Sequence, residues 1–240
     1  MNRRRFLGGL GTVTILVLGG AVWYADEEGA FSQGKGPAFS PWTDWNQPQT
    51  GMLALVRAGI LAASPHNTQP WLFRVRGSQI EVLAETSRNT GGLDPFLREL
   101  HIGMGCAVEN MDVASPTAGY VADIEIADGA LNLHADTSTA QRVATVGCTP
   151  ASFPANPLYA MLPDRHTNRT AYELRALPAS FQQEMLAMPQ SLPNTKVFLF
   201  TAEDQRQTIV DLVSRCDDIV LRRQGRKRRG DAVGASLQVE

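Results

Sequence analysis

Two apolar segments with helical spacing stand on either side of a short strand pair, and this order limits the chain to a mixed fold. Residues 52–63 (MLALVRAGILAA) are apolar around most of a helical circumference, as a buried helix would be. Residues 96–114 show a second helical pattern. Between them, residues 72–75 and 80–83 predict a β-hairpin that turns at a Gly-Ser pair. Three small residues of the second helix predict close packing against another helix: Gly103, Gly105 and Cys106.

Later segments continue the mixed pattern. They predict a strand pair at residues 121–126 and 131–134, helices at 154–162 and 179–187, a strand at 197–201 and a helix at 202–222. The expected fold class is therefore α+β, an antiparallel sheet flanked by helices. No glycine-rich loop follows a strand, so neither a Rossmann nor a P-loop fold is expected.

Charge and cysteine content exclude several kinds of site. Six of the basic side chains lie in residues 222–230, so the rest of the chain is acidic although the net charge is −2. An acidic body argues against nucleic acid as the main partner. The three cysteines are far apart and predict neither a metal site nor a disulfide framework. Packing in apolar surroundings is the expected role of Cys106, Cys148 and Cys216.

The last segment, residues 222–240, lacks an apolar face and is expected to be a disordered, solvated tail. Two alternatives remain for it. The basic residues could form a nucleic-acid or membrane patch, or the chain could end early in residues that were never selected to fold.

The N-terminus predicts export. Arg3 and Arg4 followed by Phe6 and Leu7 match the twin-arginine pattern R-R-x-F-L, ahead of an apolar run. Residues 1–28 are therefore expected to be a signal or an uncleaved anchor that engages the twin-arginine export machinery. The expected location is periplasmic or membrane-anchored. The alternative is a stop-transfer helix, because the run approaches the ~20 residues that a membrane span needs.

A polar stretch, SPHNTQPW, follows the first predicted helix at residues 64–71. Ser64 and Gln69 each precede a proline, which disfavours helical backbone and predicts a stiff, extended loop. Such a loop would hold a hydroxyl, an imidazole and two amides at fixed spacing. A structural turn, in which Asn67 bonds its own backbone and Trp71 fills the core, is the alternative.

A second polar stretch, DRHTNRTAY, covers residues 164–172. Arg165 and Arg169 are four residues apart, with Thr167 and Asn168 between them. Two guanidinium groups and a hydroxyl can grip a phosphate, because arginine presents fork-shaped donors. The alternative is a solvated loop with surface ion pairs of little energetic value.

Together the two stretches carry a resemblance. Residues 62–71 (AASPHNTQPW) resemble the A-P-S-x-x-N-x-Q-P-W stretch of the nitroreductase flavoprotein superfamily, and residues 165–172 (RHTNRTAY) are similar to its R-x-S-x-R-x-Y element. The resemblance implies an FMN cofactor, with the arginine element on the phosphate and the other stretch along the isoalloxazine. It implies these cofactor-binding residues: Ser64, His66, Asn67, Gln69, Arg165, Thr167, Asn168 and Arg169.

The two elements occur here in reversed order, about a hundred residues apart. This order is explained if one chain fuses two nitroreductase-like halves, residues 29–150 and a partial second half at 151–221, as in the Acg-like branch. The first half has no arginine in residues 41–54, so one FMN site per chain is expected. A complete second half would need more chain, which makes this one look truncated.

The expected function is an FMN-dependent oxidoreductase of the nitroreductase type. It would take electrons from NAD(P)H or another donor and reduce a small nitro-aromatic or quinone-like acceptor. No side chain stands out as a nucleophile or general base, so the flavin would carry the chemistry. Two alternatives stay open: a protein that binds or sequesters FMN without turnover, and a truncated, non-functional fragment.

Overall fold

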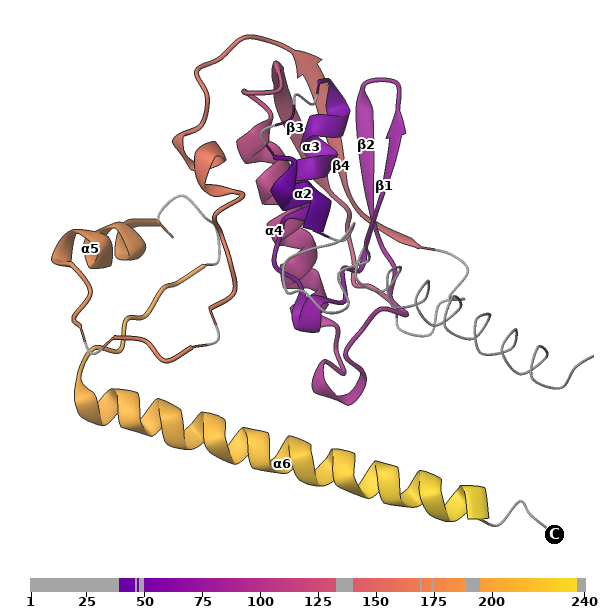
Figure 1. The fold of residues 1–240 in the computed structure, drawn as a ribbon, viewed down its shortest axis with the longest axis vertical. Helices are drawn as coiled ribbons and strands as arrows, with labels where there is room; N and C mark the ends of the chain where they lie inside the picture. The colour runs from indigo at the N-terminus through magenta and orange to yellow at the C-terminus, as the bar shows by residue number, and fades with distance from the viewer. Residues whose placement is uncertain are drawn as a thin grey trace, which may run out of the picture. The chain divides into compact units, whose positions relative to one another are not determined.

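The computed structural model describes residues 39–45, 47, 50–132, 140–168, 170–173, 175–188 and 195–236 (Figure 1). The chain divides into two compact units. The first comprises the described parts of Met1–Thr90 and Asp94–Thr167, and the second those of Gly91–Leu93 and Asn168–Glu240.

The first unit is built on a four-stranded antiparallel sheet. Its strands are β1 (Trp71–Arg76), β2 (Gln79–Ala84), β3 (Tyr120–Ile126) and β4 (Gln141–Pro150), in the order β1-β2-β4-β3. The predicted hairpin is confirmed: β1 pairs with β2 from Trp71↔Ala84 to Arg76↔Gln79. Gly77 supplies the turn with a φ of 55°, a value that favours glycine. The α+β class is confirmed.

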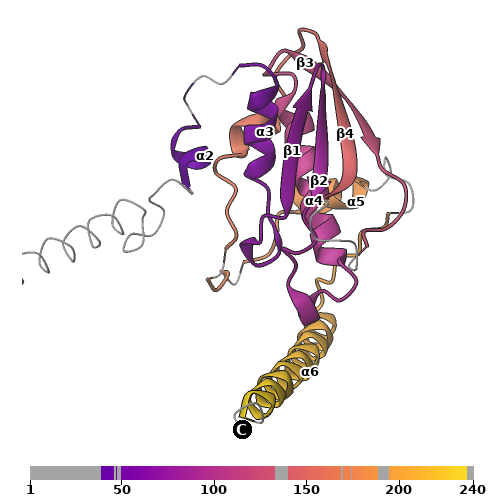
Figure 2. The ribbon, with the colours of Figure 1, turned by 90° about the vertical axis from the view of Figure 1, so that its right-hand side faces the viewer.

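Helices α3 (Met52–Ile60) and α4 (Arg98–Ala114) cover one face of this sheet (Figure 2). Alternate residues of β2 and β4 point to them, and the shared core is fully buried at Leu55, Ile80 and Val146. Both helices lie within the predicted ranges. They approach closely at Gly59, where a Cβ atom would lie 3.1 Å from Met111 Cγ. The sheet and these two helices form the frame of the first unit.

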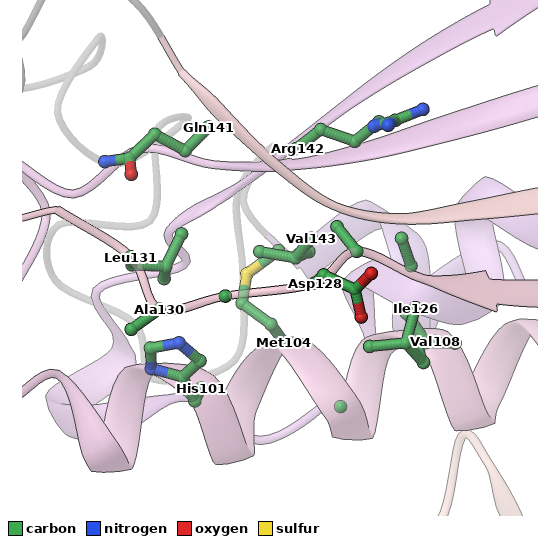
Figure 3. A pocket seen from close by; sticks show the side chains of 14 residues that line it. His101, Met104, Val108, Ile126, Asp128, Ala130, Leu131, Gln141, Arg142 and Val143 are labelled. Atoms are coloured by element: carbon green, nitrogen blue, oxygen red, sulfur yellow. The ribbon is translucent and has the colours of Figure 1, made fainter.

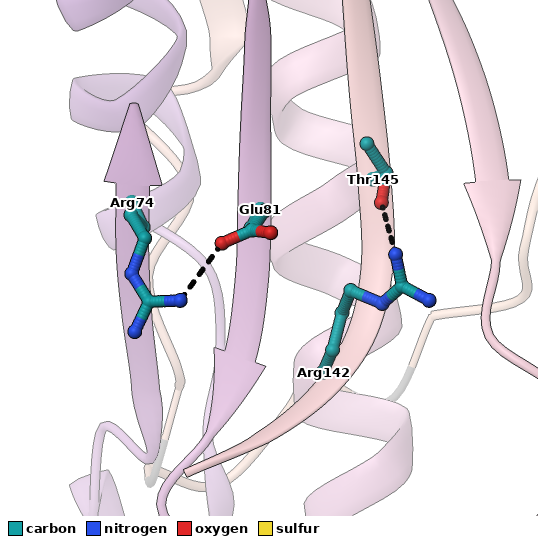
Figure 4. Close-up of polar contacts among 4 residues, drawn as sticks. All are labelled: Arg74, Glu81, Arg142 and Thr145. Atoms are coloured by element: carbon teal, nitrogen blue, oxygen red, sulfur yellow. Dashed lines mark hydrogen bonds and ion pairs between the residues drawn. The ribbon is translucent and has the colours of Figure 1, made fainter. Parts of the chain in front are cut away.

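The opposite face of the sheet carries polar side chains on β1, β2 and β4 (Figure 4). Arg74 on β1 and Glu81 on β2 are register partners, and their ion pair measures 3.0 Å. Arg142 Nη1 on β4 donates to Thr145 Oγ1 at 3.4 Å. These are cross-strand and same-strand contacts of a partly solvated surface, so they contribute little stability.

One strand pairing was predicted wrongly. Strand β3 was expected to pair with residues 131–134, but it pairs with β4, from Tyr120↔Pro150 to Ile126↔Ala144. Strand β4 itself was missed. It provides a ten-residue ladder to β2 and β3 and buries Ala144, Val146 and Cys148, which a short hairpin partner could not do. Residues 133–139 lie outside the described residues.

The remaining helices are divided between the two units. The first unit contains α2 (Ser40–Thr43) and the 3₁₀ helices η2 (Pro65–Asn67) and η4 (Pro157–Met161), the last within the helix expected at 154–162. The second contains η3 (Gly91–Leu93), α5 (Ala179–Ala187), as predicted, and α6 (Glu203–Ser236).

The second unit departs from prediction in two places. Residues 197–201 form no strand: the described backbone offers them no ladder partner, and Phe198 is 70% exposed. Helix α6 continues to Ser236 rather than ending near Arg222, so the helix covers most of the tail expected to be disordered. Arginine, lysine and glutamine are good helix formers, which favours this continuation.

Among the described residues, no helix has both the length and the apolar character needed to cross a membrane. Residues 1–28, where an export signal or anchor is expected, lie outside the described part of the chain.

Candidate functional site

The loop at residues 64–69 leaves the C-terminal end of α3 and leads into β1. Ser64 is extended, with φ −136° and ψ 153°, as its position before proline predicts. Gln69 was expected to be extended too, but its φ is 45°. Its backbone N–H donates to Ser64 Oγ at 3.1 Å, a bond that closes the loop and holds Gln69 in this conformation. The Ser64 hydroxyl therefore has a structural role, because its hydrogen bond stabilises the conformation of this loop.

Three residues of this loop adopt left-handed backbone conformations that L-amino acids avoid. The φ values are 48° at His66, 58° at Asn67 and 45° at Gln69. A non-glycine residue in this region costs about 1–2 kcal/mol, somewhat less for asparagine. Three such residues within four positions are held by the surrounding structure, and strain of this kind concentrates at functional sites.

Polar contacts hold the strained loop. Gln69 Nε2 donates to Asn67 Oδ1 at 3.1 Å, and Arg88 Nη1 donates to the Gln69 carbonyl at 3.2 Å. His66 and Asn67 are exposed. Asn67 Oδ1 accepts the bond from Gln69, but the amide N–H groups of Asn67 remain able to donate to a ligand. The ring nitrogens of His66 can also hydrogen-bond to a ligand. The loop therefore presents donors on a rigid backbone.

Arg88 is a supporting residue that sequence reasoning missed. It follows Glu85, whose carboxylate accepts hydrogen bonds from the Ser87 side chain at 2.6 Å and the Ser87 backbone at 3.3 Å. These bonds, together with the nearby Arg88 charge, lower the pKa of Glu85. Glu85 also donates its own backbone N–H to the Pro70 carbonyl at 2.7 Å. The turn after β2 thus supports the end of the loop.

Helix α4 packs directly behind the loop at Gly103. A Cβ atom there would lie 3.3 Å from Pro65 Cδ and 3.4 Å from the Ala63 carbonyl oxygen. The predicted close packing is confirmed at Gly103, but its neighbour is the loop and not another helix. The same prediction is wrong at Gly105, where no atom lies within 4 Å of a Cβ position. A cavity of about 210 Å³ opens beside this contact, lined by Ala63, Ser64, Pro65, Glu99, Ile102, Gly103 and Cys106.

Arg165, from the second polar stretch, lies next to the start of the first polar stretch. Its Nη2 donates to the carbonyl of Leu61 at 2.9 Å, three residues before Ser64. Its Nε is buried and has no hydrogen-bond partner among the described residues. A guanidinium with a buried, unpartnered donor can bind an anion in addition to its structural bond.

The other predicted site residues are placed differently. Thr167 is exposed and ends the first unit, whereas Asn168 begins the second. Asn168 Oδ1 accepts hydrogen bonds from the backbone N–H and the hydroxyl of Thr170, at 3.0 and 2.7 Å. Arg169 lies outside the described residues. The first unit therefore contains Ser64, His66, Asn67, Gln69, Arg165 and Thr167.

A second cavity, of about 300 Å³, lies between α4 and the ends of β3 and β4 (Figure 3). Figure 3 shows His101 at one end of it and Asp128 nearer Val108 and Ile126. Sequence reasoning missed this cavity. The one signal was Gly105: the exposed face of a helix seldom carries glycine, and no atom lies within 4 Å of where its Cβ would be.

The cysteines differ in exposure. Cys148 is buried, and burial raises the pKa of its thiol. Cys106 is half-buried against the core, so packing is confirmed for these two. Cys216 is exposed on α6, and the prediction that it packs in apolar surroundings is wrong for the described residues. The solvent-facing side of a helix can carry a cysteine that sequence alone does not distinguish from a buried one.

Similar proteins are found among curated sequences and among solved structures. No protein-family model matches the chain. Two curated relatives from Mycobacterium tuberculosis, strains CDC 1551 / Oshkosh and ATCC 25618 / H37Rv, both bear the name "Putative NAD(P)H nitroreductase". Each is 32% identical to this chain over 148 residues, which is 60% of this chain and 40% of the relative.

A solved structure titled "Putative NADH Oxidase", from Clostridium acetobutylicum, superposes with a TM-score of 0.34 and 15% sequence identity, over 51% of this chain and 86% of that one. The chain thus spans less than half the length of the curated relatives it matches, and over that part its sequence is similar to nitroreductases.

Proposed function

We propose that this chain belongs to the nitroreductase superfamily, in its Acg-like branch, and binds FMN as a nitroreductase-type oxidoreductase. The similarity to two nitroreductase-named relatives supports the oxidoreductase class. The observation that carries the proposal is the strained loop of His66, Asn67 and Gln69 with Arg165 at its base.

The residues of the first unit suit two parts of FMN. Asn67 and His66 would face the polar edge of the isoalloxazine, since they are exposed on a backbone held by Ser64 and Arg88. Arg165 would hold the phosphate, because its Nε is a buried donor without a partner among the described residues. On the sequence pattern alone, we also propose Thr167, Asn168 and Arg169 as phosphate contacts.

FMN would supply the redox chemistry, accepting a hydride and passing electrons to an acceptor. The protein would fix the position of the ring and adjust its electronics through hydrogen bonds. We propose NAD(P)H or another donor, and a nitro-aromatic or quinone-like acceptor. None of the proposed site residues is assigned a nucleophilic or acid-base role.

The arrangement of motifs supports two fused halves in one chain. The loop belongs to residues 29–150 and the arginine element to residues 151–221, so one site would form within a chain. We also propose export by the twin-arginine route, on the residues Arg3, Arg4, Phe6 and Leu7 alone.

The absorption spectrum of the purified protein tests the cofactor, and donor oxidation with a nitro-aromatic present tests the activity. We expect a flavin band and acceptor-dependent turnover, with FMN on acid extraction. A band without turnover would support the flavin-sequestering alternative. A chain that binds no flavin after incubation with FMN would overturn the proposal and favour a non-functional product. Extraction of FAD would contradict the single-phosphate site.

A further inference from the structure

The cavity of Figure 3 has an apolar floor and an open mouth. Its floor is formed by side chains of the core, Met104 and Val108 on α4 and Val143 on β4, which are buried or half-buried. Ile126, 65% exposed, stands at the mouth. A volume of about 300 Å³ is at the small end of ligand sites and suits a compact molecule with one ring.

Two side chains at the mouth, His101 and Asp128, offer hydrogen-bond acceptors. His101 Nδ1 lies 2.5 Å from the Leu97 carbonyl, so this nitrogen carries the proton in that bond. In the neutral ring Nε2 is then an acceptor. Asp128 adds a carboxylate on the same cavity, and it is exposed.

The other two lining residues with side-chain N–H donors are directed elsewhere. Arg142 donates to Thr145 Oγ1 at 3.4 Å on the polar face of the sheet, and Figure 3 shows its guanidinium turned away. The Gln141 side chain forms two hydrogen bonds with the backbone of Asn132: its Oε1 accepts from the Asn132 N–H at 2.7 Å, and its Nε2 donates to the Asn132 carbonyl at 2.8 Å. Among the described lining side chains, the charge and hydrogen-bonding capacity that face the cavity are therefore negative and accepting.

We propose that this cavity binds a small arylalkyl amine, with the ring on Met104, Val108 and Val143 and the ammonium group toward Asp128. The ammonium would donate hydrogen bonds to the Asp128 carboxylate, and its charge complements that group. The ring would remove Ile126 and the exposed part of Val143 from water.

This site is separate from the proposed flavin site. Its lining residues share none with the cavity beside the strained loop. A nitro group offers only acceptors, so it would face Asp128 and His101 unfavourably. The inference therefore does not depend on the proposed reductase function, and it is tested without flavin or electron donor.

Gly105 provides a direct test, because it lines the cavity and its Cβ position is open. Leucine there would fill the space from the helix side without a backbone clash, and both alanine and leucine are better helix formers than glycine. Gly105→Ala is the matched control, since one methyl group leaves most of the volume free.

Benzylamine is the probe, titrated into the full chain by calorimetry or ligand-observed NMR, with benzoate as the probe of opposite charge. We expect benzylamine to bind about tenfold tighter than benzoate, since an exposed carboxylate is partly screened. Asp128→Asn should weaken benzylamine about three- to tenfold. Asp123→Asn, which removes the same charge from the middle of β3, should leave binding unchanged.

Gly105→Leu should abolish benzylamine binding while Gly105→Ala retains it, with helical circular dichroism confirming both folds. The proposal is overturned if benzoate binds as tightly as benzylamine, if benzylamine shows no saturable binding, or if Asp128→Asn binds like the wild type. Undiminished binding to folded Gly105→Leu would place the ligand elsewhere and would also overturn it.

Discussion

Arg165 Nη2 donates a 2.9 Å hydrogen bond to the carbonyl of Leu61, which lies 104 residues earlier in the chain. Leu61 is the C-cap of α3, where helix carbonyls carry partial negative charge. A guanidinium stabilises that end of the helix and at the same time stands beside the loop that begins at Ser64. The same side chain therefore links the stability of the first unit to its candidate site.

Arg165→Ala should weaken both fold and flavin binding. Loss of a half-buried charge-assisted bond should lower the free energy of unfolding by about 1–2 kcal/mol. Flavin occupancy, measured as the ratio of visible to ultraviolet absorbance, should fall as well. Arg165→Lys keeps the charge, so its stability and its flavin occupancy should lie between those of the wild type and of Arg165→Ala. Arg175→Ala is the matched control, since its ion pair with Glu173 is exposed. Full stability and occupancy in Arg165→Ala would refute both roles.

Glycine at position 66 should separate stability from function. His66 has a φ of 48°, so His66→Gly relieves backbone strain and should raise the free energy of unfolding by about 1 kcal/mol. The substitution also removes the imidazole that is proposed to face the flavin, so flavin occupancy should fall. Thr68→Gly is the control: its φ is −67°, so glycine relieves no backbone strain there, and by loosening the unfolded chain it should not stabilise as His66→Gly does. A His66→Gly protein less stable than wild type would show that the loop is not strained.

The elements that could be predicted from sequence are those with local signals. Residues 52–63 and 179–187 contain α3 and α5, and the Gly-Ser turn defined the β1–β2 hairpin, because periodicity and turn chemistry act within a few residues. The pairing of β3 with β4 is non-local and was missed, since the alternative partner at 131–134 was nearer in sequence. Residues 197–201 have strand composition, but a strand also needs a partner's backbone.

The candidate site was predictable in composition but not in conformation. The prolines beside Ser64 and Gln69 indicated a stiff loop, yet Gln69 is left-handed because its N–H is bound by the Ser64 hydroxyl. The bond from Arg165 to Leu61 and the support from Arg88 depend on tertiary packing, and no short-range pattern indicates them. The cavity near His101 also depends on tertiary packing, since α4, β3 and β4 all line it.

The two glycines of α4 should respond oppositely to alanine. At Gly103 the new methyl group would press on Pro65 at 3.3 Å and on the Ala63 carbonyl at 3.4 Å, so the loop must shift. Gly103→Ala should lower flavin occupancy, and overpacking should cost about 1–3 kcal/mol of unfolding free energy. Gly105→Ala meets no atom within 4 Å and should stabilise the helix by about 1 kcal/mol. Urea denaturation compares the pair, and equal shifts would contradict the close approach at Gly103.

The cysteines should react with a thiol reagent in order of exposure. Cys216 should be modified first, Cys106 more slowly, and Cys148 only when the protein unfolds. Mass spectrometry of a timed maleimide reaction identifies the order, and early labelling of Cys148 would contradict its burial.

The Cys148 thiol also gives a pH dependence. Because its pKa is raised in the folded state, its contribution to stability is complete below the thiol's ordinary pKa and is lost as pH rises through the folded pKa. The difference in unfolding free energy between wild type and Cys148→Ala should therefore shrink in alkaline solution. A difference that stays constant from neutral pH upward would exclude this linkage.

Flavin stoichiometry tests the fused-halves architecture. One site per chain is expected, because residues 41–54 of the first half contain no arginine to hold a second phosphate. Deletion of residues 222–240 should leave occupancy unchanged, since neither polar stretch lies there. Asn67→Leu should lower it although every arginine remains, because a polar edge of the flavin would face an apolar group. An unpaired buried polar group costs about 1–3 kcal/mol, which corresponds to an affinity weaker by roughly five- to 150-fold. Calorimetry that counts two sites per chain, or an Asn67→Leu protein that binds FMN as tightly as wild type, would rule the architecture out.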